Sequence, residues 1–185
     1  MHQVQATATK AIPQVLGAEQ FVFVTEVGLN YLDLPSDLQF EGYGTSLPVL
    51  QSSANIAAGG SAQPGGWATK KSWGYRIAAR LEYPNAVMGV NVIPRIAFSH
   101  DVEGVGPNFN KGALAVTFGV GFSYQQNWQA DLSYTGFAGG RTFCGTDVAA
   151  LSAAPLAAGQ SLSFCSSANS LKDRDFIAFN VSYAF

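Results

Sequence analysis

Few residues of this sequence could carry out nucleophilic chemistry. Ser99, His100 and Asp101 are adjacent and contain the three residue types of a serine-hydrolase triad. Neighbouring side chains on a β-strand point to opposite faces, so Ser99 and His100 could not meet within an extended segment. The second histidine of the chain, His2, lies far away near the N-terminus. We therefore expect no catalytic site here and do not expect an enzyme.

The two cysteines, Cys144 and Cys165, are separated by 20 residues within one long segment that has no strand pattern. In a protein exported to an oxidising compartment, such a pair forms a disulfide. Closing a loop of this size stabilises the fold by about 3 kcal/mol in the chain-entropy treatment. A metal site would need further ligands, and no histidine or third cysteine lies nearby. We predict a disulfide, no metal and no cofactor.

Six charged side chains fall on segments with a strand pattern, always on the less apolar of the two faces. They are Glu26, Arg76, Arg80, Glu82, Arg95 and Asp131. One interpretation is a set of neutralised structural pairs inside a narrow or plugged barrel. The other is a polar lining that faces a lumen and selects solutes by charge. The sequence leaves both open.

The segments that must position these side chains alternate between apolar and polar or small residues, as strands with two different faces do. The clearest run, 73–83, sets six apolar residues against five small or charged ones. Pro94 removes one donor from the fourth run and predicts a bulge or local weak point there. The seven runs lie near 2–10, 20–31, 73–83, 88–100, 113–124, 128–137 and 174–185. We predict one all-β domain over 1–185, an antiparallel up-and-down sheet of about seven strands.

Composition separates a membrane barrel from a soluble sandwich. Charged residues make up only 12% and apolar residues 48% of the chain, too few charges to cover a soluble surface. No run approaches the roughly 20 apolar residues of a transmembrane helix. Large rings crowd the expected strand ends on the apolar face, as in the aromatic girdles of transmembrane barrels. These rings are Tyr31, Trp73, Tyr83, Tyr124, Trp128, Tyr134 and Tyr183.

The expected connections alternate between short and long. The short ones are 11–19, 84–86 and 125–127, and the long ones are 32–72, 101–112 and 138–173. Outer-membrane barrels have short periplasmic turns and long extracellular loops. The five lysines fall at expected strand tips or in loops. We therefore predict a segment of a transmembrane β-barrel in the bacterial outer membrane, in contact with its lipid.

The last residues predict how such a barrel is assembled. Phe179, Val181, Tyr183 and Phe185 alternate up to the C-terminus. This pattern resembles the signal by which the barrel-assembly machinery recognises its clients, so we expect that machinery as a partner.

Several runs resemble the C-terminal region of the DUF1302 family of outer-membrane β-barrels. They are 73–83 (WGYRIAARLEY), 90–101 (VNVIPRIAFSHD), 104–107 (GVGP), 129–134 (QADLSY) and 173–176 (DRDF). The resemblance covers the whole chain. It implies a longer barrel of poorly defined function, encoded near export systems for lipids or other hydrophobic molecules, and it brings no catalytic motif.

Strand parity predicts an incomplete barrel. Seven strands with a periplasmic C-terminus would start outside the cell, whereas even-stranded barrels begin and end in the periplasm. The first residues also have neither the basic start nor the apolar centre of a signal peptide, so we expect that Met1 is not the natural start. Missing N-terminal strands, or another chain, would be needed to close the barrel.

The predicted function is a passive, porin-like channel or conduit for small hydrophobic or amphipathic molecules. The solute class comes from the family resemblance alone. The alternative is a non-transporting structural or adhesive surface barrel that acts through its extracellular loops. No basic run suggests nucleic acid.

Overall fold

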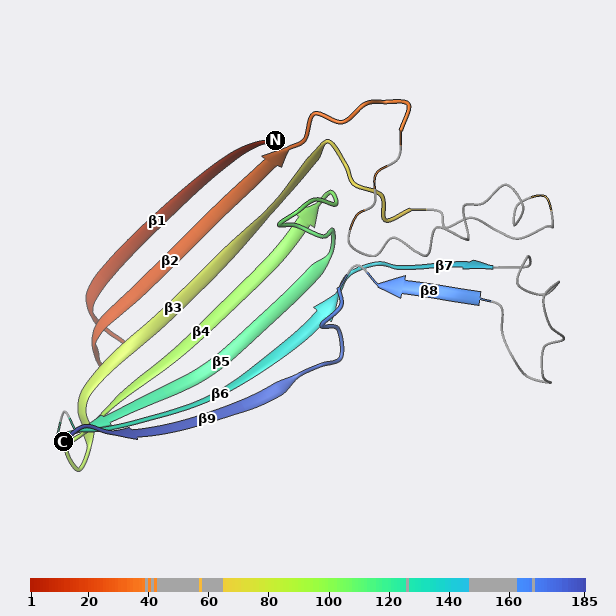
Figure 1. Ribbon diagram of the computed structural model, residues 1–185. Coiled ribbons are helices and arrows are strands. Elements are labelled where there is room, and N and C mark those ends of the chain that lie inside the picture. Colours follow the sequence, from red (N-terminus) through yellow and green to blue (C-terminus); the bar gives the residue numbers. More distant parts are fainter. Residues whose placement is uncertain are drawn as a thin grey trace, which may run out of the picture.

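The computed structural model describes residues 1–38, 40, 42, 57, 65–125, 127–146, 163–167 and 169–185. Seven strands form one antiparallel sheet in the order β1-β2-β3-β4-β5-β6-β9, and β7 and β8 form a separate hairpin (Figure 1). The sheet strands are β1 (His2–Val15), β2 (Ala18–Tyr31), β3 (Lys71–Val87), β4 (Val90–Glu103), β5 (Ala113–Tyr124), β6 (Trp128–Gly139) and β9 (Phe176–Tyr183). The prediction of seven antiparallel strands is confirmed.

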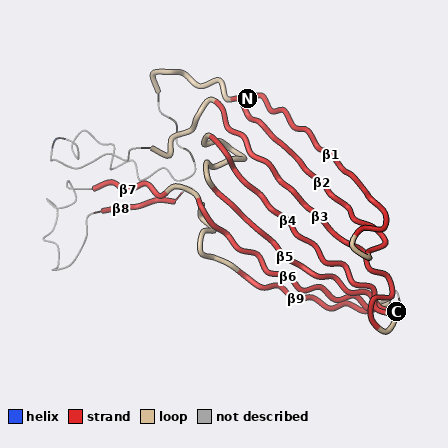
Figure 2. The backbone as a smooth tube through the Cα atoms, turned by 180° about the vertical axis from the view of Figure 1, so that it is seen from behind, coloured by secondary structure: helices blue, strands red, loops and turns tan. Residues whose placement is uncertain are grey.

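The sheet is open in the described residues: β1 pairs only with β2, and β9 pairs only with β6. Figure 2 shows the two edge strands at opposite sides of one continuous layer. No helix in the described part of the chain is long and apolar enough to cross a membrane.

Tight turns join the strands at the end of the sheet where the C-terminus lies (Figure 1). Leu16 and Gly17 join β1 to β2, and Met88 and Gly89 join β3 to β4; all four residues have positive φ. Positive φ at both central residues defines the type I′ turn, whose twist matches that of a hairpin. The connections at the opposite end are long, so we call the two ends the turn end and the loop end.

Two of the predicted short connections are wrong in position. The strands continue through 11–15 and 18–19, because the I′ turn needs only Leu16 and Gly17. At 84–86 the backbone of β3 makes a bulge instead of a turn, and the strand ends at Val87. One consequence is that Lys10 lies inside β1, opposite Phe23, and not at a strand tip.

At Pro94 the structure shows a weak point without a bulge. Pairing between β3 and β4 joins Arg80 to Arg95 and Tyr83 to Val92, so the register is kept across the proline. The ladder skips the residue itself, because proline has no N–H to donate.

The register sorts the side chains into two faces. The apolar face carries exposed large side chains, among them Phe118 at 53% and Ile177 at 73% exposure. At the turn end, one row of this face aligns Val90, Tyr124, Trp128 and Tyr183 across four strands. We call the opposite side, which holds Glu26 and its register partner Arg76, the polar face.

The tightest packing lies at the loop end. Buried apolar residues of the described structure are Ala18, Val105 and Phe109, and two of these three lie in the segment 104–112 that joins β4 to β5. Because the sheet is a single layer, it has no apolar core between two layers. Burial is instead created where this segment folds over the polar face.

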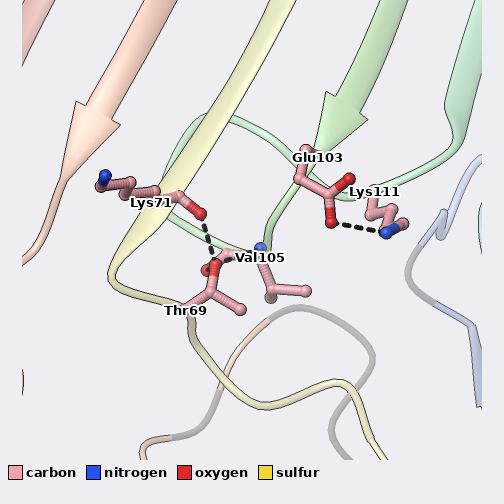
Figure 3. A network of polar contacts seen from close by, with 5 residues as sticks. All are labelled: Thr69, Lys71, Glu103, Val105 and Lys111. Carbon is pink, nitrogen blue, oxygen red and sulfur yellow. Dashed lines mark hydrogen bonds and ion pairs between the residues drawn. The ribbon is translucent and has the colours of Figure 1, made fainter.

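Thr69 fastens the segment 104–112 to the connection before β3. Its Oγ1 accepts a hydrogen bond from the Val105 N–H at 2.8 Å, and its N–H donates to the Val105 carbonyl at 2.8 Å (Figure 3). Lys111 and Glu103 form an ion pair at 2.5 Å beside it. These contacts hold the base of the segment in place.

The predicted disulfide is present between Cys144 and Cys165. The two residues are opposite each other in a hairpin formed by β7 (Thr142–Thr146) and β8 (Ser163–Ser167). The sequence analysis placed this region in a loop, because strands this short leave no clear alternation. Figure 1 shows the hairpin extending beyond the loop end of the sheet.

Candidate functional site

The candidate site is the polar face, where the structure brings together all six predicted charged side chains. Glu26 stands opposite Arg76, and Arg80 stands opposite Arg95. Asp131 shares this face through the register of β4, β5 and β6.

Arg95 and Asp131 form the best-defined contact of the face. The guanidinium group donates two hydrogen bonds to the carboxylate, one of them from Nη2 to Oδ1 at 2.7 Å. The pair reaches from β4 to β6 and therefore crosses β5, which contributes glycine at two successive polar-face positions. Both side chains remain more than a third exposed, so solvent screens their attraction.

Gly119 makes this crossing possible. A Cβ added to Gly119 would lie 2.8 Å from the Arg95 Cζ, whereas one added to Gly121 would make ordinary contact at 3.7 Å with Asp131. Because glycine has no side chain, it leaves space on the polar face of this strand. At Gly119 the space is filled by the guanidinium group of Arg95.

Two hollows line the polar face. The one nearer the loop end has a volume of about 280 Å³ and is bordered by Glu26, Arg76, Ser99 and Thr117. The one nearer the turn end has a volume of about 440 Å³ and is bordered by Arg80, the Arg95–Asp131 pair and Asn180. Each hollow therefore combines charged groups with small or apolar walls.

The remaining predicted charges are satisfied in different ways. Arg80 forms an ion pair with Glu82 of the same strand at 2.9 Å. Glu26 accepts a hydrogen bond from the Thr7 hydroxyl at 3.3 Å. These contacts differ in geometry and leave several polar atoms of the charged residues facing the two hollows.

Ser99 and His100 point to opposite faces, as strand geometry requires. Ser99 is paired with Arg76 on the polar face, and His100 is paired with Tyr75 on the apolar face. The His100 ring lies 5.5 Å from the Tyr75 ring and 6.4 Å from the Phe98 ring, measured between centroids. The described residues contain no group of three or more His, Cys, Asp and Glu side chains that could hold a metal ion.

Sequence reasoning missed a packed cluster at the loop end of the polar face. Phe109, 6% exposed, contacts the faces of Gly28 and Gly74, which are register partners in β2 and β3. The next pair outward, Asn30 and Ser72, is 1% exposed at each residue. The aromatic residue in the otherwise polar connection 101–112 was the available signal, because the alignment of the two glycines becomes visible only once the register is known.

The predicted assembly-signal residues lie on or just after the edge strand β9. Phe179, Val181 and Tyr183 occupy its apolar face, and Phe185 follows the strand. The Tyr183 ring lies 4.7 Å from that of Trp128 on β6. The alternation therefore continues the apolar face to the sheet edge.

Sheet and site together define an all-β protein with one apolar face and one charged face. Comparison with protein families gives a match, over residues 1–185, to the family described as "Protein of unknown function (DUF1302)". The chain therefore belongs to the DUF1302 family. Comparisons with curated proteins and with solved structures gave no match.

Proposed function

We propose that this sheet is part of the wall of an outer-membrane β-barrel that acts as a passive conduit for small hydrophobic or amphipathic molecules. The observation that carries the proposal is the division of the sheet into two chemically different faces. Such a division suits a wall between lipid and a polar lumen. Further strands or another chain would pair with the open edges of β1 and β9, since unpaired edges promote association.

The apolar face supports contact with lipid. Its large side chains, such as Phe118 and Phe179, are exposed on a single-layered sheet that offers no second layer to cover them. The row of Tyr124, Trp128 and Tyr183 at the turn end suits an interface between lipid and water. The same outward band would contact the barrel-assembly machinery during insertion.

The polar face supports a conduit. Its two hollows have mixed walls, which suit solutes that carry both apolar and polar parts. Arg95 and Asp131 neutralise each other, Arg80 is paired with Glu82, and Arg76 stands opposite Glu26, so the positive and negative charges of this face balance. A lumen lined this way would pass amphipathic solutes and respond to single charge substitutions.

Single-channel conductance of the full-length protein in a planar bilayer tests the proposal. We expect steady current steps that amphipathic solutes reduce in a concentration-dependent way. Asp131→Asn should shift selectivity toward anions, because it leaves Arg95 unneutralised, and Arg95→Gln should shift selectivity toward cations. A folded, inserted protein that carries no current and takes up no solute would contradict the conduit.

The second candidate function is a non-transporting structural or adhesive barrel. It is favoured by the disulfide-linked hairpin β7–β8, which extends beyond the loop end and is held closed by Cys144 and Cys165. Deleting 138–173 should then abolish binding to a surface partner while permeability stays unchanged. Under the conduit proposal, the same deletion should alter conductance.

A further inference from the structure

We propose that the tip of the segment 104–112, from Gly106 to Phe109, is a gate over the loop end of the polar face, with Phe109 as its latch. The inference rests on the proposed function for its role in transport, and it concerns the regulation of the same face. It follows from what lies under the tip: two aligned glycines that receive a ring, and two buried polar side chains without a hydrogen-bond partner among the described residues.

The ring of Phe109 occupies a position that only glycine leaves free. A Cβ added to Gly28 would lie 2.9 Å from the Phe109 Cζ, and one added to Gly74 would lie 2.8 Å from its Cδ1. Gly28 and Gly74 are directly opposite each other in β2 and β3. We call these two residues the glycine seat. With the ring in the seat, the tip covers this end of the polar face.

Hydrogen bonds fix the base of the segment, while the tip contacts the sheet through the Phe109 ring and Gly106. The Asp101 carboxylate accepts from the Asn110 N–H at 2.8 Å, and the Asp101 carbonyl accepts from the Gly112 N–H at 2.7 Å. Gly104 and Gly112 both have positive φ, of 81° and 83°. The tip itself closes with one hydrogen bond, from the Gly106 N–H to the Phe109 carbonyl at 2.9 Å. The segment is anchored at its flanks and has a glycine at each end, Gly104 and Gly112. This arrangement suits a tip that can leave the glycine seat.

Two buried polar side chains oppose the closed position. The side-chain nitrogen and oxygen of Asn30 and the Oγ of Ser72 are shielded from solvent and make no hydrogen bond with any described residue. Gly106 lies directly over Ser72, since a Cβ added to Gly106 would be 2.5 Å from that Oγ. Buried polar groups without partners destabilise the state that buries them. If the Phe109 ring left the glycine seat, water would reach the side chains of Asn30 and Ser72. Burial of the ring therefore favours the closed position, and burial of the two polar side chains favours the open one.

The opposing contributions predict opposite effects for neighbouring substitutions. Phe109→Ala removes the ring and should open the gate, whereas Asn30→Leu combined with Ser72→Ala removes the opposing polar groups and should close it. If the loop were static, neither set of substitutions would change access to the polar face. Gly28→Ala should also open the gate, because the atoms that its new Cβ would meet belong to the Phe109 ring.

Thiol accessibility measures the gate without requiring transport. Both native cysteines are joined in the disulfide, so Ser99→Cys introduces one free thiol on the polar face, inward of the seat. In the full-length protein, we expect Phe109→Ala and Gly28→Ala to raise its rate of reaction with a polar thiol reagent about fivefold or more. The Asn30→Leu, Ser72→Ala double variant should lower the rate by a similar factor. Phe118→Ala, on the apolar face, is the matched control and should leave the rate unchanged.

A double-mutant cycle isolates the latch. In the Phe109→Ala background, Gly28→Ala should have no further effect, because its added methyl group then meets no ring. Phe109→Leu keeps an apolar side chain in the seat and should give an intermediate rate in a folded protein. Equal rates for all variants, or an undiminished Gly28→Ala effect without the ring, would overturn the gate. Variant-dependent rates in a protein without conductance would instead reject the conduit and keep the moving tip.

Discussion

The pair formed by Arg95 and Asp131 shows how a single glycine can determine the electrostatics of a whole face. In the sheet order only β5 separates the strands that carry the two residues, and the guanidinium group crosses that strand over Gly119. A side chain at this position would compete with the guanidinium group for the same space. The charge pattern of the polar face therefore depends on a residue that carries no charge.

Substituting Gly119 tests this dependence. Gly119→Ala should displace the flexible end of Arg95 from Asp131 and change ion selectivity by rearranging the charges without removing one, at a cost of at most about 1 kcal/mol of stability because the pair is solvent-screened. Gly121→Ala is the matched control, since its Cβ would lie 3.7 Å from the nearest atom, in Asp131. Reversal potentials in a salt gradient check both variants. Equal potentials for Gly119→Ala and the unmodified protein would contradict the assigned role.

Asp175 predicts a pH dependence at the start of β9. The Tyr134 hydroxyl donates to its carboxylate at 2.6 Å and the Phe137 N–H donates at 2.8 Å, which together hold the pKa of Asp175 below its usual range. A carboxyl group whose pKa is lower in the folded state stabilises above its unfolded pKa of about 3.9. That contribution is lost as the pH falls through the lower folded pKa.

Thermal unfolding between pH 7 and pH 2 measures this effect. Asp175→Asn should flatten the acid end of the stability profile and lower the stability at pH 7. Asp173→Asn, two residues earlier in the same connection, is the matched control for the removal of one carboxylate. Asp175→Asn could instead shift the whole curve of stability against pH without changing its slope at acid pH. That result would contradict the assignment of the pH dependence to the Asp175 carboxylate.

Among the elements, the I′ turns determine where the strands end. Gly17 and Gly89 have φ of 78° and 86°, a region that costs a side chain about 1 kcal/mol or more. Gly17→Ala should therefore destabilise the β1–β2 hairpin by about that amount, although no atom lies within 4 Å of its Cβ position. Gly17→Asn should recover most of the loss, because asparagine tolerates this conformation. Denaturant unfolding measures the free energy of unfolding of both variants. Equal values for Gly17→Ala and Gly17→Asn would rule out backbone strain as the cause.

The hairpin β7–β8 is an element that the sheet does not need. Reduction of the disulfide, or paired Cys144→Ser and Cys165→Ser, should speed amide exchange in 142–146 and 163–167. The sheet strands should keep their protection, since the sheet pairs β6 directly with β9. Hydrogen exchange by mass spectrometry distinguishes the two regions. Loss of protection in β6 and β9 on reduction would show that the hairpin supports the sheet.

For the whole molecule, the two faces predict opposite tolerance for charge. Phe118→Arg places a cation at mid-strand on the apolar face, where the proposed contact with lipid would make it unfavourable by about 2–4 kcal/mol. Ala115→Arg, three residues earlier, faces the hollow that contains Glu26 and should be tolerated. Folding into lipid vesicles, followed by protease protection, compares the variants. Equal insertion of both would contradict a membrane-facing apolar face.

Different experiments would contradict the membrane assignment, the polar conduit and the gate. Under the proposals, insertion would depend on the apolar face, ion selectivity on Arg95 and Asp131, and thiol accessibility on Phe109. A protein that inserts but shows no current would support the structural or adhesive alternative. The three measurements therefore separate where the protein resides from what its polar face does.

Alternation was enough to predict the seven strands and their two faces, because a period of two follows from strand geometry whatever the neighbours are. The charged side chains, such as Arg76 and Asp131, could be assigned to one face on the same ground. The antiparallel order came from the up-and-down barrel that the composition and the short and long connections indicated. The disulfide followed from the count of cysteines, since Cys144 had one possible partner.

Contacts between strands and connections could be decided only by the tertiary structure. Alternation leaves the register free, and register is what places Gly28 opposite Gly74 and allows Arg95 to reach Asp131 across Gly119. The positions of the turns were missed for a related reason: a two-residue I′ turn interrupts the alternation too briefly to be distinguished from a strand. The fold of the segment around Phe109 depends on a surface built from β2 and β3, which no local pattern in 104–112 encodes.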